Sequence, residues 1–156
     1  MLLVLIVAAA VLFGEKFIKE RIRSALPGTF PRTFLKGHIR LEHVENTGFS
    51  ASRWANHPER VQVISTFAVL GAILSTIPEL FRRKKDGLFH VAAGLLMGGS
   101  IANLLDRTFR GSVTDYLRFP TLPWKKVRSL VFNLADLCIF LGAGLMMLRI
   151  LFPKKK

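Results

Sequence analysis

Cysteine is nearly absent from this sequence. Of its 156 residues, one is cysteine, Cys138, and it lies inside an apolar run. A single thiol excludes an intrachain disulfide and a cysteine-based metal site. We therefore expect Cys138 to be a buried, unreactive thiol.

Catalytic and metal-binding motifs built on histidine or serine are also missing. Ser100 and Ser129 have no evident base beside them, so no Ser/His/Asp arrangement is predicted. The histidines show no ligand spacing such as His-Glu-x-x-His. We expect all of them to be structural or solvated: His38, His43, His57 and His90.

Acidic residues are scarce as well. Ten Asp and Glu stand against 23 Lys and Arg, which gives a formal net charge of +13, yet 51% of the residues are hydrophobic. The apolar residues are concentrated in blocks and the charges lie between them, which is typical of a polytopic membrane protein. The basic excess then indicates contact with lipid headgroups. Nucleic-acid binding is the alternative interpretation of such a charge, but no recognition motif accompanies it.

Four apolar segments predict four membrane-spanning helices in one domain covering residues 1–156. The expected spans are about 1–18, 61–81, 88–105 and 130–152. The first span is short, and a cleaved signal peptide is its alternative, although a basic start and a clear cleavage site are missing. The third contains Gly94-x-x-x-Gly98-x-x-x-Ala102, a face of small residues that predicts close packing against another helix.

Basic residues between the spans predict the orientation. The link between the second and third spans, Arg82-Arg-Lys-Lys85, is short and basic, and the chain ends in Lys154-Lys-Lys156. The positive-inside rule places both on the cytoplasmic side, so both termini are expected there and the two longer links outside. The longer links carry more basic residues in total, which favours the opposite orientation, but the rule gives more weight to short, dense links.

The first outer link predicts a small antiparallel sheet on the membrane surface. His38-Ile-Arg-Leu-Glu-His43 alternates polar and apolar residues, as strands do. Residues 33–36 are the expected partner strand, with Gly37 near the bend, and Asn46-Thr-Gly48 is a turn signal. The second outer link, Phe119-Pro-Thr-Leu-Pro-Trp-Lys-Lys126, mixes aromatics with cations, which indicates anchoring at the membrane interface.

Two aspartates, Asp115 and Asp136, lie beside or inside apolar stretches. A carboxylate at the centre of a membrane helix costs about 2.5–3.5 kcal/mol on insertion scales, so it is rarely kept without a use. Two close carboxylates do not both ionise easily, and one of them therefore holds a proton. The pair predicts general acid and base catalysis on a water held between them.

Further polar residues lie close to this pair in the expected fold. Asn103, Asp106 and Arg107 share one face of the third span, because three and four residues separate them. Asn133 lies three residues before Asp136 in the fourth span. Because the third and fourth spans run antiparallel, we expect these groups to meet at the outer end. A cluster of this kind must satisfy its own hydrogen bonds.

In combination these motifs resemble those of signal peptidase II, the lipoprotein signal peptidase family. The resemblance rests on Asn103-Leu-Leu-Asp106-Arg107, Gly111-Ser-Val-Thr-Asp115 and Phe132-Asn-Leu-Ala-Asp136. Two weaker matches lie upstream. Asn46-Thr-Gly48 resembles the family's asparagine-x-glycine element, and Glu15-x-x-x-Lys19 resembles its aspartate-x-x-x-lysine near the end of the first helix.

The resemblance implies an all-α membrane protein with four transmembrane helices and a small extracytoplasmic antiparallel β-cradle. It implies an intramembrane aspartyl endopeptidase that needs no metal or cofactor, with Asp115 and Asp136 as the catalytic dyad. The positions that would bind substrate or support the dyad are Asn46, Gly48, Asn103, Asp106, Arg107, Asn133, Glu15 and Lys19. Among these, Asp106 is expected to order Arg107 and the helix end.

The implied substrates are bacterial prolipoproteins, which the family cleaves on the amino side of a diacylglyceryl-modified cysteine. Membrane lipids are the other expected partners, and nucleic acid is not one. We expect a monomer in the bacterial inner (cytoplasmic) membrane, with its active site at the extracytoplasmic face.

Four departures from the family's pattern are present. Glu15 stands where the family has aspartate, Phe49-Ser50-Ala51 replaces a small, small, aromatic run, and Ala102 replaces a glycine. The first span also has few residues before Glu15. The first two departures lie in elements that contact substrate in the family, so the sequence leaves the preferred cleavage motif open and predicts a divergent peptidase.

Plainer interpretations of the supporting residues stay open. Glu15 and Lys19 also fit an i,i+4 surface pair, and Arg107 fits an anchor for lipid phosphate. Asn103 and Asn133 also fit simple hydrogen bonding between helices.

Alternatives to catalysis stay open too. Asp115 also fits a solvated carboxylate in a loop. At the level of function, one alternative is a membrane protein of the same fold that binds lipopeptide without cutting it. The other is a proton or cation carrier, which would need polar residues across the whole bilayer.

Overall fold

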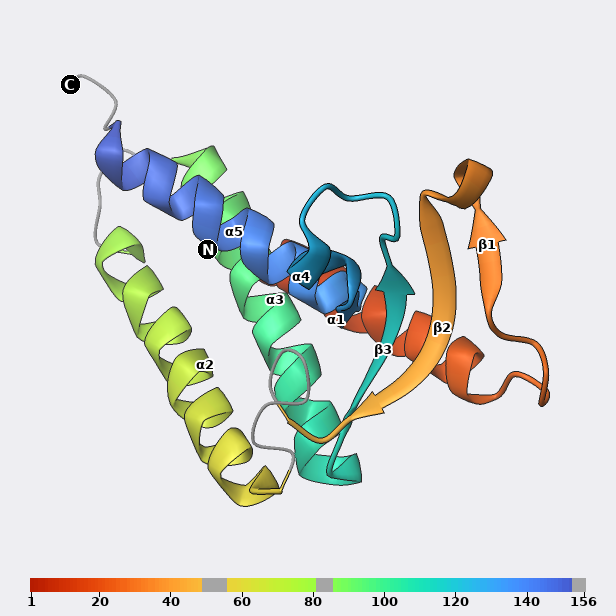
Figure 1. Ribbon diagram of the computed structural model, residues 1–156. Helices are drawn as coiled ribbons and strands as arrows, with labels where there is room; N and C mark the ends of the chain where they lie inside the picture. Colours follow the sequence, from red (N-terminus) through yellow and green to blue (C-terminus); the bar gives the residue numbers. More distant parts are fainter. Residues whose placement is uncertain (49–55, 81–85, 153–156) are drawn as a thin grey trace.

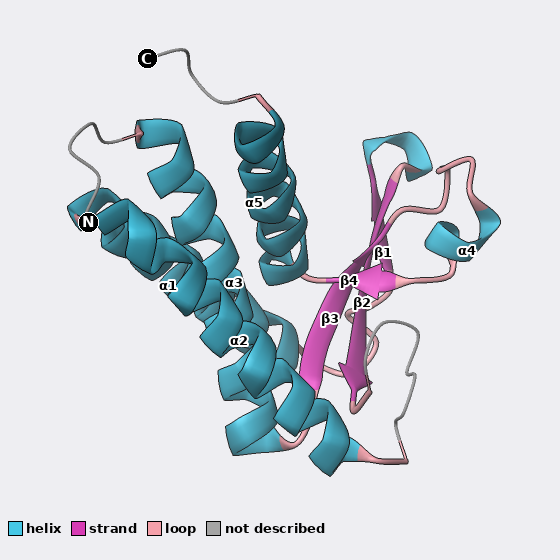
Figure 2. Cartoon of the chain, turned by 90° about the vertical axis from the view of Figure 1, so that its left-hand side faces the viewer, coloured by secondary structure: helices cyan, strands magenta, loops and turns pink. Residues whose placement is uncertain are grey.

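The computed structural model describes residues 1–48, 56–80 and 86–152. It is mostly helical, with a small antiparallel sheet at one side of the helices (Figures 1 and 2). The long helices are α1 (Leu2–Arg23), α2 (Pro58–Leu80), α3 (Gly87–Arg110) and α5 (Leu134–Leu151). The shorter elements are β1 (Arg32–Phe34), the 3-10 turn η1 (Leu35–Gly37), β2 (Ile39–Asn46), β3 (Val113–Arg118), α4 (Lys125–Arg128) and β4 (Val131–Phe132).

Helix α3 is the central helix and contacts α1, α2 and α5. Its glycines allow the neighbouring backbones to approach closely. A Cβ atom on Gly98 would lie 2.7 Å from the carbonyl oxygen of Ala8 in α1, and one on Gly99 would lie 2.5 Å from that of Ala135 in α5. A Cβ on Gly94 would lie 2.6 Å from Val7 Cβ. The predicted packing face of small residues on this helix is therefore confirmed.

Large apolar side chains cover much of the outer surface of the helices. Among the described residues, one helix is both long enough and apolar enough to cross a membrane. It is α3, with a mean hydropathy of 1.6 over its most apolar window. Large hydrophobic side chains are exposed on all four long helices, for example Phe13 on α1, Phe67 on α2, Phe109 on α3 and Phe140 on α5. Such a surface suits contact with lipid rather than with water.

The predicted hairpin in the first outer link is confirmed, with slightly shifted bounds. Strands β1 and β2 are antiparallel, and Phe34 is paired with Ile39 across a turn in which Lys36 has φ +54°. Lys36 thus belongs to the turn and not to the strand. The sheet has the order β1-β2-β3-β4, so two further strands extend it.

Helix boundaries differ from the predicted spans. Helix α1 continues beyond residue 18 to Arg23, and α3 continues beyond residue 105 to Arg110, where Gly111 with φ +75° ends it. The predicted fourth span begins with strand β4, because Asn133 caps the helix and α5 begins only at Leu134. Cys138 is buried in α5, as predicted.

Candidate active site

Strand β3 carries Asp115 and presents its two faces to different surroundings. Val113 and Asp115 line a cavity, whereas the alternate residues Thr114 and Tyr116 bond to side chains of α1. This is the period of two that a strand imposes on its side chains. Asp115 is only 4% exposed, so the alternative of a solvated carboxylate in a loop is wrong.

The first turn of α5 positions Asp136. Asn133 and Asp136 form a capping box: the Asp136 backbone N–H donates to Asn133 Oδ1 (2.8 Å), and the Asn133 backbone N–H donates to Asp136 Oδ2 (3.1 Å). Such reciprocal bonds satisfy backbone donors that a helix start leaves unpaired. The Asp136 carboxylate is thereby held at the helix end that faces the sheet.

Side-chain amides connect the two aspartates. Asn133 Nδ2 donates to Asp115 Oδ1 (2.7 Å), while the same residue holds Asp136 through the capping box. Asn46 Nδ2 donates to Asp115 Oδ2 (3.0 Å), and Asn103 Nδ2 donates to Asp136 Oδ1 (2.8 Å). Asn133 Nδ2 also reaches Asn103 Oδ1 (3.3 Å), which closes the network. The structure therefore brings together residues that are far apart in the chain, as predicted.

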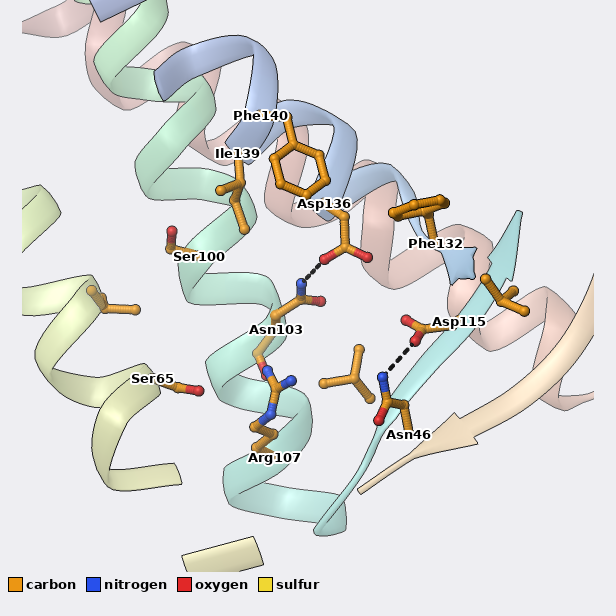
Figure 3. Close-up of a pocket in the computed structure, with 13 residues that line it drawn as sticks. Asn46, Ser65, Ser100, Asn103, Arg107, Asp115, Phe132, Asp136, Ile139 and Phe140 are labelled. Atoms are coloured by element: carbon orange, nitrogen blue, oxygen red, sulfur yellow. Dashed lines mark hydrogen bonds between the residues drawn. The ribbon is translucent and has the colours of Figure 1, made fainter. Parts of the chain in front are cut away.

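Both carboxylates point into one cavity of about 270 Å³ (Figure 3). Its lining mixes polar residues with apolar and aromatic ones. The polar residues include Asn46, Asn103, Arg107, Asp115 and Asp136, and the apolar ones include Val69, Val131, Phe132, Ile139 and Phe140. A cavity with such a mixed lining suits a peptide backbone next to an apolar side chain or acyl chain.

Arg107 closes the cavity between α3 and the end of β2. Its Nη2 donates to the carbonyl oxygen of Gly48 (3.1 Å), and its Nη1 donates to that of Asn103 (3.4 Å). Gly48 N–H in turn donates to Asn46 Oδ1 (3.0 Å). The predicted asparagine-x-glycine element therefore lies beside Asp115, whereas Phe49-Ser50-Ala51 lies outside the described residues.

Glu15, Lys19 and Asp106 form a buried ion cluster behind the amides. Lys19 is 1% exposed, and its Nζ lies 3.1 Å from Glu15 Oε1 and 2.8 Å from Asp106 Oδ2. The same Nζ donates to Asn103 Oδ1 (2.9 Å), which links the cluster to the cavity wall. The alternative of a surface pair for Glu15 and Lys19 is thus wrong. The reason is that α3 covers this face of α1.

Asp106 lies on the α1 side of α3, away from the cavity that Asn103 and Arg107 line. Besides Lys19 it pairs with Arg23 of α1 at 3.6 Å and with Arg110 at 3.9 Å. The expectation that Asp106, Asn103 and Arg107 share one face is therefore corrected. On a helix, residues i+3 and i+4 lie to either side of residue i. Asp106 therefore turns to the α1 side of Asn103, and Arg107 turns to the cavity side.

The electrostatics favour a shared proton. Burial, together with the charge of Asp136, raises the pKa of Asp115 from its ordinary 3.8 to about 7, although the hydrogen bonds from Asn46 and Asn133 oppose this. A raised pKa of this kind favours a proton held by the pair near neutral pH. A pair of this kind offers one proton donor and one proton acceptor at the same place. In the described ranges, no group of three His, Cys, Asp or Glu side chains is arranged to hold a metal ion.

Tyr116 is a site residue that the sequence analysis missed. It is the one tyrosine of the chain, is 3% exposed and follows Asp115 directly. The available signal was the alternation in Val-Thr-Asp-Tyr-Leu-Arg, which is typical of a strand with two different faces. The missed strand left the direction of this side chain unassigned.

Known proteins are similar to this chain in sequence or in fold. Residues 7–152 match the family described as signal peptidase (SPase) II. A lipoprotein signal peptidase of Symbiobacterium thermophilum is 32% identical over 123 residues, which cover 78% of this chain and 76% of the relative. One from Dehalococcoides mccartyi is 34% identical over 142 residues, with coverages of 86% and 80%.

A solved structure described as a bacterial membrane enzyme has the same fold. Its TM-score is 0.80 at 18% sequence identity, and the alignment covers 98% of this chain and 92% of that chain. The fold agrees over nearly the whole molecule, and the sequence match extends through the strand and helices that carry Asp115 and Asp136. By sequence this chain belongs to the signal peptidase II family.

Proposed function

We propose that this protein is an intramembrane aspartyl endopeptidase that cleaves the signal peptide of bacterial prolipoproteins on the amino side of a diacylglyceryl-modified cysteine. The observation that carries the proposal is that Asp115 and Asp136 point into one cavity and are both bonded to Asn133. Membership of the family supports the choice of substrate.

The pair performs hydrolysis as follows. The ionised carboxylate takes a proton from a water held between the two side chains, and the water oxygen attacks the scissile carbonyl carbon. The protonated carboxyl donates a hydrogen bond to the carbonyl oxygen, where negative charge develops. Collapse of the tetrahedral intermediate breaks the C–N bond, and the leaving nitrogen takes a proton from the dyad. The two carboxyls titrate as a unit, so neither role belongs to one residue alone.

The fold supports a placement at the membrane surface. We infer that the four long helices lie in the membrane with both termini cytoplasmic, and that the sheet lies on the outer face. Asp115 belongs to β3, and Asp136 belongs to the first turn of α5. This end of α5 lies next to the sheet (Figure 2). A diacyl anchor in the outer leaflet would therefore bring a cleavage site to the depth of the dyad, and burial of its chains adds about 0.8 kcal/mol per CH₂.

The test is cleavage of a synthetic diacylated prolipoprotein peptide by the purified protein in detergent. Asp115→Asn and Asp136→Asn are each expected to lower kcat by about 10³-fold or more, because each removes one member of the acid–base pair. Glu59→Gln, a carboxylate-to-amide change at the exposed start of α2, serves as the matched control and should cleave normally.

Three outcomes would contradict the proposal. Full activity of either aspartate variant removes the dyad from the mechanism. Wild-type protein that binds the peptide without cutting it would be a lipopeptide-binding protein of this fold. Equal cleavage of an unlipidated precursor would remove the role of the lipid anchor.

A further inference from the structure

The hydroxyl of Tyr116 contacts two helices from its place on a strand. It donates to Glu15 Oε2 of α1 (2.8 Å) and accepts from the backbone N–H of Leu134 at the start of α5 (3.1 Å). Tyr116 is 3% exposed and Glu15 is fully buried, so water does not compete strongly for these bonds. One oxygen atom therefore joins β3, α1 and α5.

This oxygen lies between the two segments that carry the aspartates. Asp115 immediately precedes Tyr116 on β3, and Asp136 follows Leu134 by two residues on α5. The ladder between β3 and β4 ends with Leu117 paired to Phe132. Beyond that pair, two hydrogen bonds join the segments: Asn133 Nδ2 donates to Asp115 Oδ1, and the Leu134 N–H donates to the Tyr116 hydroxyl. The second of these fixes the backbone at the start of α5 relative to β3.

The Glu15 carboxylate orients the Tyr116 hydroxyl. Its Oε1 faces Lys19 Nζ at 3.1 Å, and its Oε2 is the atom that accepts from the phenol. Because the phenol has one O–H, which it uses to donate a hydrogen bond to Glu15, its oxygen presents lone pairs to the Leu134 N–H. The buried ion cluster thus determines the direction of the hydroxyl, and the hydroxyl determines where the first turn of α5 lies relative to β3.

We propose that Tyr116 is a positioning residue, whose hydroxyl sets the separation between the carboxylates of Asp115 and Asp136. The proposal rests on the proposed peptidase function. A shift of about 1 Å in the relative position of two reacting groups can lower a rate by about 10²-fold. Loss of the hydroxyl should therefore slow the chemical step and leave the binding of the peptide almost unchanged.

The experiment removes the bond from each side in turn. Tyr116→Phe deletes only the hydroxyl. Leu134→Pro deletes the N–H donor together with the leucine side chain, at the first position of a helix, where proline is well tolerated. The preceding Asn133 has φ −128° and ψ 173°, an extended conformation that a following proline allows. Leu134→Ala controls for the lost leucine side chain.

Thr114→Val is the matched control for the hydroxyl. Thr114 lies on the same strand and the same face, and its hydroxyl bonds to Arg23 of α1 and to Glu45 of β2 at 2.9 Å each. It makes neither of the bonds that link β3 to α5. If any lost buried hydroxyl on β3 slowed the enzyme, this variant would slow it as much as Tyr116→Phe.

The expected result is a decrease of kcat by about 10- to 100-fold in both Tyr116→Phe and Leu134→Pro, with KM within about twofold of wild type. The double variant should lose no more than the larger single loss, since both changes delete the same bond. The alkaline limb of the pH profile should move to lower pH, because a wider separation weakens the repulsion that keeps one carboxyl protonated. Leu134→Ala and Thr114→Val should keep the wild-type kcat and pH profile.

Several outcomes would overturn the inference. Wild-type protein that cleaves, together with a Tyr116→Phe variant of normal kcat, would overturn it and leave the peptidase function intact. Losses that multiply in the double variant would assign independent roles to the two groups. If Tyr116→Phe fails to fold, a folded Leu134→Pro variant of normal kcat overturns the inference on its own. Wild-type protein without cleavage would overturn the peptidase function and the inference with it.

Discussion

Amide side chains hold the two aspartates in this protein. Asn46 and Asn133 donate to Asp115, and Asn103 donates to Asp136. A neutral amide orients a carboxyl group without the strong lowering of its pKa that an adjacent cation causes. The cation Lys19 bonds to Asn103 and pairs with Glu15 and Asp106 rather than with either carboxylate of the dyad, although its charge still opposes the rise in the pKa of Asp115.

Asn133 is expected to be the most sensitive of the three amides, because it contacts both carboxylates. Asn133→Ala should lower kcat by about 10²-fold and, by loss of the helix cap, the free energy of unfolding by about 1 kcal/mol. Asn133→Ser keeps a capping oxygen but deletes the amide that reaches Asp115. Cleavage rates and thermal unfolding of both variants should show restored stability with low activity in the serine variant. Full activity there would contradict the role of the amide.

Two lysines one turn apart on α1 should differ strongly in their effect on stability. Lys19→Met leaves the buried carboxylates of Glu15 and Asp106 without this cation and should lower the free energy of unfolding by about 3–5 kcal/mol. Lys16 is exposed, and its Nζ lies 3.9 Å from Glu20 Oε1. Lys16→Met should therefore change the free energy of unfolding by less than about 1 kcal/mol. Thermal unfolding in detergent measures both. Equal effects would show that the Lys19 pair is as weak as a surface pair.

At the residue scale, the polar residues of the site could be predicted from the sequence, but which side chains are buried could not. Asp115, Asp136, Asn103 and Asn133 are unusual near apolar runs and were therefore recognisable. The Glu15–Lys19 pair has the same i,i+4 spacing on a surface as in a core, and nothing in its spacing indicates which side α3 covers.

At the scale of elements, glycine positions decide how closely the helices approach. Gly98→Ala would place a Cβ 2.7 Å from a backbone oxygen of α1, which cannot move aside as a side chain can. We expect the variant to lose about 1–3 kcal/mol of unfolding free energy. Gly14→Ala, within α1 and with nothing within 4 Å of the added atom, should instead gain about 0.5–1 kcal/mol. Chemical or thermal unfolding of the pair tests this, and a neutral Gly98→Ala would show that the two helices separate easily.

The same scale explains which elements could be predicted. The four long helices show in the sequence as apolar blocks, and the β1–β2 hairpin shows as an alternation of polar and apolar residues. Strand β4 has two residues and exists because it pairs with Leu117 and Arg118 of β3. Strand β3 pairs with β2 across a long separation in the chain, with Asp115 opposite Val44. Neither pairing is visible in local periodicity.

For the whole molecule, the shared proton predicts how activity depends on pH. The proposed mechanism needs one protonated and one ionised carboxyl, and the pKa of Asp115 is raised to about 7. Above that value kcat/KM should fall by about tenfold per pH unit, as the protonated member is lost. Initial rates on the diacylated peptide between pH 5 and 9 measure this. A flat profile up to pH 9 would contradict a shared proton.

The free energy of unfolding should also depend on pH through Asp115. Because the folded-state pKa of Asp115 is raised above its ordinary 3.8, its favourable contribution is complete below about pH 4 and is lost as the pH rises through about 7. The loss is on the order of 4 kcal/mol. Asp115→Asn should therefore be more stable than wild type at pH 8, and the difference should shrink toward pH 4. An equal difference at both pH values, measured by thermal unfolding, would contradict the raised pKa.

The sequence by itself determined the long helices, the packing face on α3, the identity of the polar residues and the resemblance to signal peptidase II. These features are encoded in apolar blocks, small-residue spacing and motifs over short stretches. The tertiary structure decided that Lys19 is buried, that Asp106 lies behind the cavity, and that Tyr116 reaches both Glu15 and Leu134. These contacts join residues as far as 101 positions apart. Burial and the spacing of carboxylates depend on which distant segments pack together, and local patterns carry no information on that packing.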